Sequence, residues 1–203
     1  IVADGTIPGY IRTAYPVMAR DKANFVGQIL AACLGSSRAE AEDVAERVFF
    51  DFDELPAIVD ALAATDAAAP AIHPELTDFV FNRLELGEDF PDIRASAPVR
   101  LTRTYKLARQ AIVPLEGRGV VALWDERANQ LVVYSSTQSP HLIRNGLAEF
   151  LKLDQNRIRV VAPDVGGGFG YKAILHPEEL ILGFLAYKLK RPLRWLEDRR
   201  EHL

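Results

Sequence analysis

The chain has 203 residues, a formal net charge of −4, 49% hydrophobic and 26% charged residues. This is the composition of an ordinary globular protein rather than a disordered one, and the length allows one large domain or two small ones. The net negative charge argues against a nucleic-acid partner, because no basic surface is indicated. No apolar run approaches the roughly 20 residues that span a bilayer.

The single cysteine bounds the redox chemistry of the chain. Cys33 lies in an apolar run over residues 29–34, which we interpret as a buried strand with an inert thiol. One cysteine cannot form an internal disulfide, and no cysteine pair is present to hold zinc or an iron–sulfur cluster. No signal-peptide pattern is visible. These observations predict a cytoplasmic location. Because the chain begins with Ile1 rather than Met, we expect a piece of a longer polypeptide.

The first half predicts a small strand–helix–strand unit. Residues 25–34 predict a strand with a bulge at Gly27. Ser37 followed by Glu40 three positions later is a helix-start signal, and residues 38–47 carry apolar side chains at helical spacing. Residues 48–53 predict the second strand. Residues 71–97 are polar, acidic and interrupted by proline, which indicates a linker.

The second half alternates strand and helix patterns. Alternation of apolar and polar residues predicts strands, and apolar residues at helical spacing predict helices, the second of which has Pro177 in its first turn. The predicted strands are residues 99–105, 120–124, 130–135, 158–162 and 193–196; the predicted helices are residues 140–152 and 177–188. Residues 126–129 predict a turn. The fold class is therefore α+β.

Residues 161–172, with the sequence VAPDVGGGFGYK, are the most informative segment. Four glycines surround one phenylalanine after a β-branched run. Glycine reaches positive φ freely and lets main-chain N–H groups approach a ligand. Successive N–H groups of this kind form an anion-binding nest, so the segment predicts a cofactor loop. A purely structural strand-to-helix turn is the alternative.

Spacing excludes the common nucleotide loops. A dinucleotide fingerprint that starts at Gly166 requires glycine at position 171, where Tyr171 stands. A triphosphate-binding loop requires Gly-Lys-Ser/Thr, but Tyr171 separates Gly170 from Lys172, and Ala173 follows. The partner motifs of a kinase glycine loop are missing. A nucleotide-binding domain therefore stays the weakest alternative.

Four segments together resemble a known family. They are residues 111–119 (AIVPLEGRG), 135–141 (SSTQSPH), 161–172 and 191–201 (RPLRWLEDRRE). This order resembles the molybdenum-cofactor-binding large subunit of the xanthine dehydrogenase, aldehyde oxidase and carbon monoxide dehydrogenase family. Residues 19–59 resemble the later part of its hammerhead domain. The resemblance implies a hammerhead part in residues 1–70, a linker in 71–97 and the start of the cofactor-binding domain in 98–203.

The resemblance also implies which residues hold the cofactor. The metal would be held by the dithiolene of molybdopterin, in its cytosine dinucleotide form, and not by protein side chains. Bare backbone at Gly167, Gly168 and Gly170 would lie against the pterin. Phe169 would form an apolar wall beside the metal, and the Gln138 amide would donate toward an oxygen ligand of the metal. No catalytic residue is assigned within the chain, because the family's general base would lie beyond Leu203.

The resemblance implies an oxidoreductase of several subunits. Partner subunits would carry iron–sulfur clusters and FAD, and the substrate would be a small aldehyde, a heterocycle or a molecule like carbon monoxide. Purine- and aldehyde-oxidising relatives are expected to have glutamate where Ala173 stands, so we expect no purine hydroxylase and favour the carbon monoxide dehydrogenase-like branch. The alternative function is a non-catalytic scaffold that keeps the fold without the cofactor.

Several other residues have structural interpretations. Glu116 is expected to make a structural hydrogen bond rather than act in catalysis. We interpret His141 and His176 as capping or surface residues and Trp195 as core. Residues 197–201, with the sequence EDRRE, are expected to form a solvated and internally paired charge cluster.

Overall fold

A computed structural model describes residues 16–66, 68–73, 86–87, 89–108 and 110–202 of the chain. The chain divides into two units. One unit contains Pro16–Val48 and Gln110–Leu203, and the other contains Phe49–Arg109. The predicted loop and all the described strands belong to the first unit.

The first unit is built on a four-stranded sheet with the strand order β3-β2-β1-β4. Strand β1 (Gly119–Asp125) pairs antiparallel with β2 (Gln130–Ser135) and with β4 (Leu193–Leu196). Strand β3 (Ile158–Val161) pairs parallel with β2. In the β1–β2 turn, the Asp125 carboxylate accepts the N–H groups of Arg127 and Ala128, and Asn129 adopts a φ of 52°. The predictions for these elements are confirmed within a residue or two.

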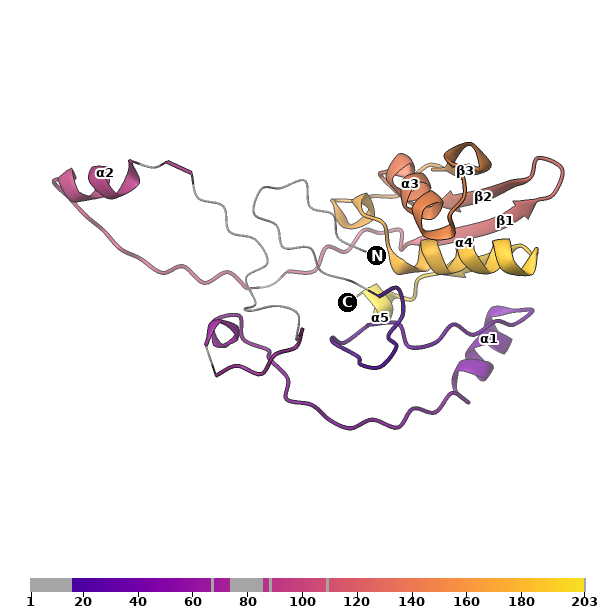
Figure 1. Cartoon of the computed structure of the whole chain (residues 1–203), viewed down its shortest axis with the longest axis horizontal. Helices are drawn as coiled ribbons and strands as arrows, with labels where there is room; N and C mark the ends of the chain where they lie inside the picture. The colour runs from indigo at the N-terminus through magenta and orange to yellow at the C-terminus, as the bar shows by residue number, and fades with distance from the viewer. Residues whose placement is uncertain (1–15, 67, 74–85, 88, 109, 203) are drawn as a thin grey trace. The chain divides into compact units, whose positions relative to one another are not determined.

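Two helices pack on the sheet and enclose the core (Figure 1). Helix α3 (Pro140–Leu151) contacts β3, and helix α4 (Pro177–Leu189) contacts β1, β2 and β4. Burial of their apolar faces is the main stabilising contribution here. The buried core consists of Val120, Ala122, Leu131, Val133, Ile143, Leu147, Ala148, Ile158, Leu180, Leu182 and Ala186. Trp195 packs against this core as predicted, and the α+β class is confirmed.

The strand predictions for the segments before residue 110 are wrong. Helix α1 (Arg38–Ala45) forms with Ser37 as its cap, as predicted, and the Ser37 side chain accepts the Glu40 N–H. Residues 25–34, 48–53 and 99–105, however, are not strands. A strand needs a neighbour that pairs its backbone groups along its length, and among the described residues these segments have no such ladder; residues 25–34 have only the bond from the Ala19 N–H to the Ile29 carbonyl as a backbone link to another segment there. Most of their apolar side chains stay exposed, and Cys33 is half-exposed in coil rather than buried in a strand.

The remaining helices are short. In the second unit, η1 (Ala63–Thr65) and α2 (Phe90–Ser96) have no buried residues. In the first unit, η2 (Gln155–Arg157) precedes β3, η3 (Tyr171–Ala173) follows the glycine loop, and α5 (Arg199–His202) follows β4. In the part of the chain that the structure describes, no helix could cross a membrane.

Helix α4 begins with a buried capping box. His176 is its N-cap, and the Glu179 carboxylate accepts the His176 N–H at 2.6 Å and the Ser135 hydroxyl at 2.9 Å. Glu179 is only 4% exposed. Burial raises the pKa of the Glu179 carboxyl from 4.5 to about 7, because desolvation outweighs the two hydrogen bonds. His176 thus acts as a cap, as the sequence predicted.

This raised pKa makes the helix start sensitive to pH. The folded state favours the protonated carboxyl, so its stabilising effect is complete below pH 4.5 and is lost as the pH rises to about 7 and above. We expect Glu179→Gln to match the parent below pH 4.5 and to exceed it at pH 8 by up to roughly 3 kcal/mol of unfolding free energy. Urea unfolding at several pH values measures the difference. A difference that does not change with pH would contradict the assignment.

Candidate cofactor site

The glycine loop connects β3 to η3 in a sharply curved backbone. Gly167 and Gly170 adopt φ angles of 96° and 87°, and Phe169 between them adopts 53°. A bulky side chain rarely takes a positive φ, so Phe169 is held there by its surroundings. Its ring is 73% exposed and lies close to the space beside Gly167. The loop therefore presents an aromatic ring at the protein surface.

Two positions of the loop must be glycine, because neighbouring side chains leave no room for a Cβ atom there. A Cβ atom on Gly168 would collide with the Gln138 side chain, and a Cβ on Gly166 would lie 2.7 Å from the Glu116 Cβ. No protein atom lies within 4 Å of the position of a Cβ on Gly170. The loop is thus packed against Gln138 and Glu116 on one side and open at Gly170.

Gln138 is fixed by both ends of the loop region. Its backbone N–H donates to the Lys172 carbonyl at 2.9 Å, and its side-chain Oε1 accepts the Gly170 N–H at 3.1 Å. Because the Gly170 N–H is a donor, the amide must turn its oxygen toward the loop. The Nε2 group of this exposed side chain makes no hydrogen bond with the described residues, and it is therefore available to donate to a ligand.

The loop also leaves main-chain donors available. The N–H groups of Gly166, Gly167, Gly170 and Tyr171 all have partners within the protein. Those of Gly168 and Phe169 have none among the described residues. Two adjacent N–H groups without partners, at a backbone that turns left-handed, are a donor set suited to an anionic or carbonyl-rich ligand. The sequence predicts an anion-binding nest in this segment, and it stays a prediction.

Glu116 ties the loop to the sheet. Its Oε2 atom accepts the Gly166 N–H at 2.7 Å, the Ser136 hydroxyl at 2.8 Å and the Lys172 ammonium at 2.7 Å. The Lys172 side chain is completely buried. Partial burial alone would raise the pKa of Glu116, but the hydrogen bonds from Lys172, Gly166 and Ser136 lower it overall. The expected structural hydrogen bond of Glu116 is confirmed.

A second charged network holds the far end of the loop. Arg118 binds Glu178 through two N–H groups at 2.8 Å and Glu197 through its Nε at 2.8 Å. The Tyr171 hydroxyl donates to Glu197, and the Tyr171 ring stacks on His202 with centroids 4.3 Å apart. Burial and the bond to Glu197 raise the pKa of Tyr171. Glu197 is 1% exposed, so the predicted solvated cluster over residues 197–201 is wrong at its first residue.

Comparisons with known proteins identify the family of the chain. A family model described as the molybdopterin cofactor-binding domain matches residues 72–203. The chain belongs to this family. The resemblance found in the sequence is therefore confirmed.

Individual relatives agree with the family. The chain is 33% identical over its whole length to the nicotine 6-hydroxylase large subunit of Paenarthrobacter nicotinovorans and covers 25% of it. It is 29% identical to the carbon monoxide dehydrogenase large chain of Hydrogenophaga pseudoflava, over 92% of this chain and 25% of that one. The crystal structure of quinoline 2-oxidoreductase from Pseudomonas putida 86 aligns with a TM-score of 0.90 and 38% identity, over 100% of this chain and 26% of that one. The chain thus spans about a quarter of the length of these relatives.

The loop of this molybdopterin cofactor-binding domain brings most of the predicted site residues together. Gln138 contacts Gly168 and binds Gly170, and Phe169 lies over Gly167. The unpaired N–H groups of Gly168 and Phe169 and the free Gln138 amide fit a flat, polar, phosphate-bearing group. His141 is an exposed residue in the first turn of α3, as predicted. No cluster of three or more metal-ligating side chains occurs within the described residues.

Sequence reasoning missed the residues that support the loop from behind. Arg118 and Tyr171 were given no role, although both are central to the buried network beside the loop. Nothing local signals this, because the partners of Arg118 lie 60 and 79 positions away along the chain. For Tyr171 alone, a local signal was its position directly after Gly170, at the end of the glycine-rich loop.

A substitution at the buried Lys172 tests how much this residue contributes to the stability of the domain. We expect Lys172→Met to lower the unfolding free energy by about 1–3 kcal/mol, because Glu116 and Ser136 lose a charge-assisted hydrogen bond. The half-exposed Glu116 limits the cost, since water can replace part of the lost interaction. Chemical denaturation measures the change, with Lys188→Met on the exposed face of α4 as the matched control. Equal effects of the two substitutions would refute the role of Lys172.

Proposed function

We propose that this chain contributes the molybdopterin-binding loop of a molybdenum hydroxylase large subunit. Gly167, Gly168 and Gly170 would bring backbone against the cofactor, and Phe169 would supply an apolar wall that excludes water. Gln138 would donate its free amide N–H toward the metal end. The observation that supports this best is the set of unpaired donors at Gly168, Phe169 and Gln138, gathered on one loop.

The bound cofactor would supply the redox chemistry for oxidative hydroxylation. The residues of this chain would orient and shield it. Donors fixed before binding lose little freedom when the ligand arrives, and the Glu116 and Arg118 networks fix both ends of the loop. A glutamate general base is expected outside these 203 residues, as the family resemblance implies.

The substrate we propose is a nitrogen-containing aromatic ring. Relatives named for nicotine and quinoline align over the whole of this chain. The residue after Lys172 is Ala173, so the loop offers no carboxylate to orient a purine or an aldehyde. Carbon monoxide dehydrogenase large chains are also related, and carbon monoxide is the second candidate substrate.

The finer details of the assembly are part of the same proposal. The cofactor would be the molybdopterin cytosine dinucleotide, and iron–sulfur and FAD subunits would complete a hetero-oligomer. The relatives include proteins named as a large subunit and as a large chain. The hammerhead assignment of residues 1–70, the linker in 71–97, the cofactor-domain start in 98–203 and the cytoplasmic location stay predictions from the sequence.

An isosteric charge change at Gln138 tests the proposal. Glutamate can still accept the Gly170 N–H, but Gln138→Glu removes the amide donor and adds a negative charge beside an anionic cofactor. We expect the molybdenum and pterin contents of the purified complex to fall about tenfold or more, which corresponds to a loss of at least ~1.4 kcal/mol. Metal analysis and the fluorescence of the oxidised pterin measure the two contents.

The control for this experiment is Gln155→Glu. Gln155 is exposed on η2 and lies away from the loop in sequence. Its substitution by glutamate adds the same negative charge as Gln138→Glu. Unchanged cofactor content in Gln138→Glu would refute the proposed role of Gln138. An active parent complex that contains neither molybdenum nor pterin would refute the whole proposal, and an inactive complex without them would favour the scaffold alternative.

A further inference from the structure

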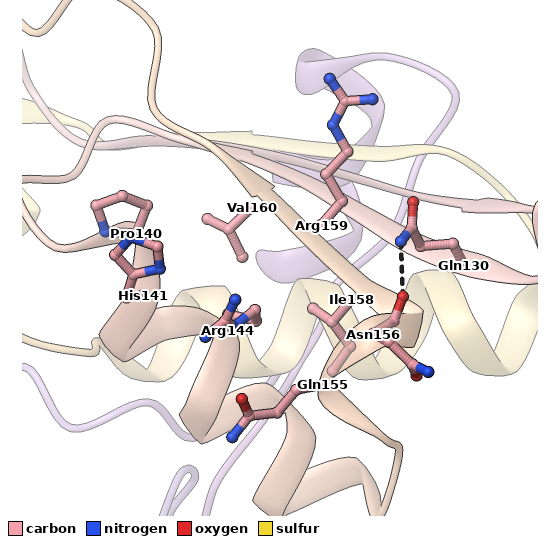
Figure 2. A pocket seen from close by; sticks show the side chains of 9 residues that line it. All are labelled: Gln130, Pro140, His141, Arg144, Gln155, Asn156, Ile158, Arg159 and Val160. Carbon is pink, nitrogen blue, oxygen red and sulfur yellow. Dashed lines mark hydrogen bonds between the residues drawn. The ribbon is translucent and has the colours of Figure 1, made fainter.

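A small cavity lies between α3 and β3, on a part of the domain that the cofactor proposal does not use. Its volume is about 310 Å³, at the lower end of the range for small-molecule sites. Ile158, Val160 and Pro140 provide apolar surface, and Arg144, His141 and Gln155 provide polar groups (Figure 2). The cavity therefore combines an apolar surface with a cationic side chain.

Arg144 is short of hydrogen-bond partners. Its Nε atom is buried and makes no hydrogen bond within the described residues. The one hydrogen bond of its guanidinium group in that part of the chain is a long contact of 3.4 Å from Nη2 to the Asn145 Oδ1 atom. A buried N–H without a partner costs about 1–3 kcal/mol. An acceptor bound in the cavity would satisfy this group.

The charges around the cavity favour an anion. None of the residues that line it carries a carboxylate, so Arg144 has no acidic neighbour in the lining. Pro140 and His141 form the first turn of the 12-residue helix α3, where the helix dipole also favours negative charge. In Figure 2, Arg159 points away from the other labelled side chains. Arg144 is thus the guanidinium group placed to meet a ligand.

We propose that this cavity binds a small organic carboxylate. The carboxylate would pair with the Arg144 guanidinium, whose planar donors match its geometry. The carbon skeleton of the ligand would lie on Ile158, Val160 and Pro140. Inorganic phosphate is a poorer match because it has no apolar part to cover this surface. None of the residues that line this site is one of those proposed to hold the cofactor, and the inference does not rest on the proposed function.

Benzoate is a suitable probe, with benzamide as its neutral counterpart and acetate as the carboxylate without an apolar ring. We expect calorimetric titration of the complete protein to show benzoate binding at millimolar concentrations. Benzamide and acetate should each bind about tenfold more weakly or worse, for lack of the charge and of the ring respectively. Equal binding of benzoate and benzamide, or no benzoate binding, would overturn the proposal.

Matched variants locate the site. Arg144→Gln should weaken benzoate binding about tenfold or more, whereas Arg194→Gln, which removes the same charge from β4 at the opposite edge of the sheet and outside the cavity lining, should leave it unchanged. Equal losses in both variants would point to general surface charge and overturn the assignment. The benzoate–benzamide comparison needs only the parent protein, so it decides the question even where Arg144→Gln does not fold. Molybdenum content should stay at the parent level in both variants, which separates this site from the cofactor loop.

Discussion

The ion pair between the buried Lys172 and the half-exposed Glu116 is the interaction on which the site depends. One carboxylate oxygen of Glu116 receives the Lys172 ammonium, the Ser136 hydroxyl and the Gly166 N–H. Glu116 lies before β1, and its partners come from the residue after β2 and from both sides of the glycine loop. A loop with four glycines has much backbone freedom to lose on folding, and a fully buried charge can be tolerated only where its partners are fixed. The pair therefore requires the loop to adopt one conformation.

The second network completes the restraint on the other side of the loop. Tyr171 follows Gly170 directly and is held by Glu197, which in turn binds Arg118. The guanidinium of Arg118 also lies 5.2 Å from the centre of the Tyr171 ring. With both ends fixed by buried charges, the middle of the loop can leave the N–H groups of Gly168 and Phe169 unpaired. Such groups are costly in a protein interior, and their presence at an exposed loop is consistent with a site prepared for a ligand.

Sequence patterns predicted the elements of the sheet unit well because those elements are amphipathic. Alternation placed β2 correctly, and helical spacing with Pro177 placed α4. The same alternation over residues 99–105 predicted a strand that does not form. Periodicity reports which side chains could share a buried face, but a strand also needs a partner for its backbone, and that partner is a property of the tertiary structure.

The sequence by itself determined the family and located the glycine loop, because closely spaced glycines leave a local signature. Only the tertiary structure decided that Glu197 is buried, that Arg118 and Tyr171 support the loop, and that Arg144 faces a cavity. Those properties arise from residues that lie 26 to 79 positions apart along the chain or on separate elements. Burial and charge pairing depend on distances in space, which no local pattern encodes.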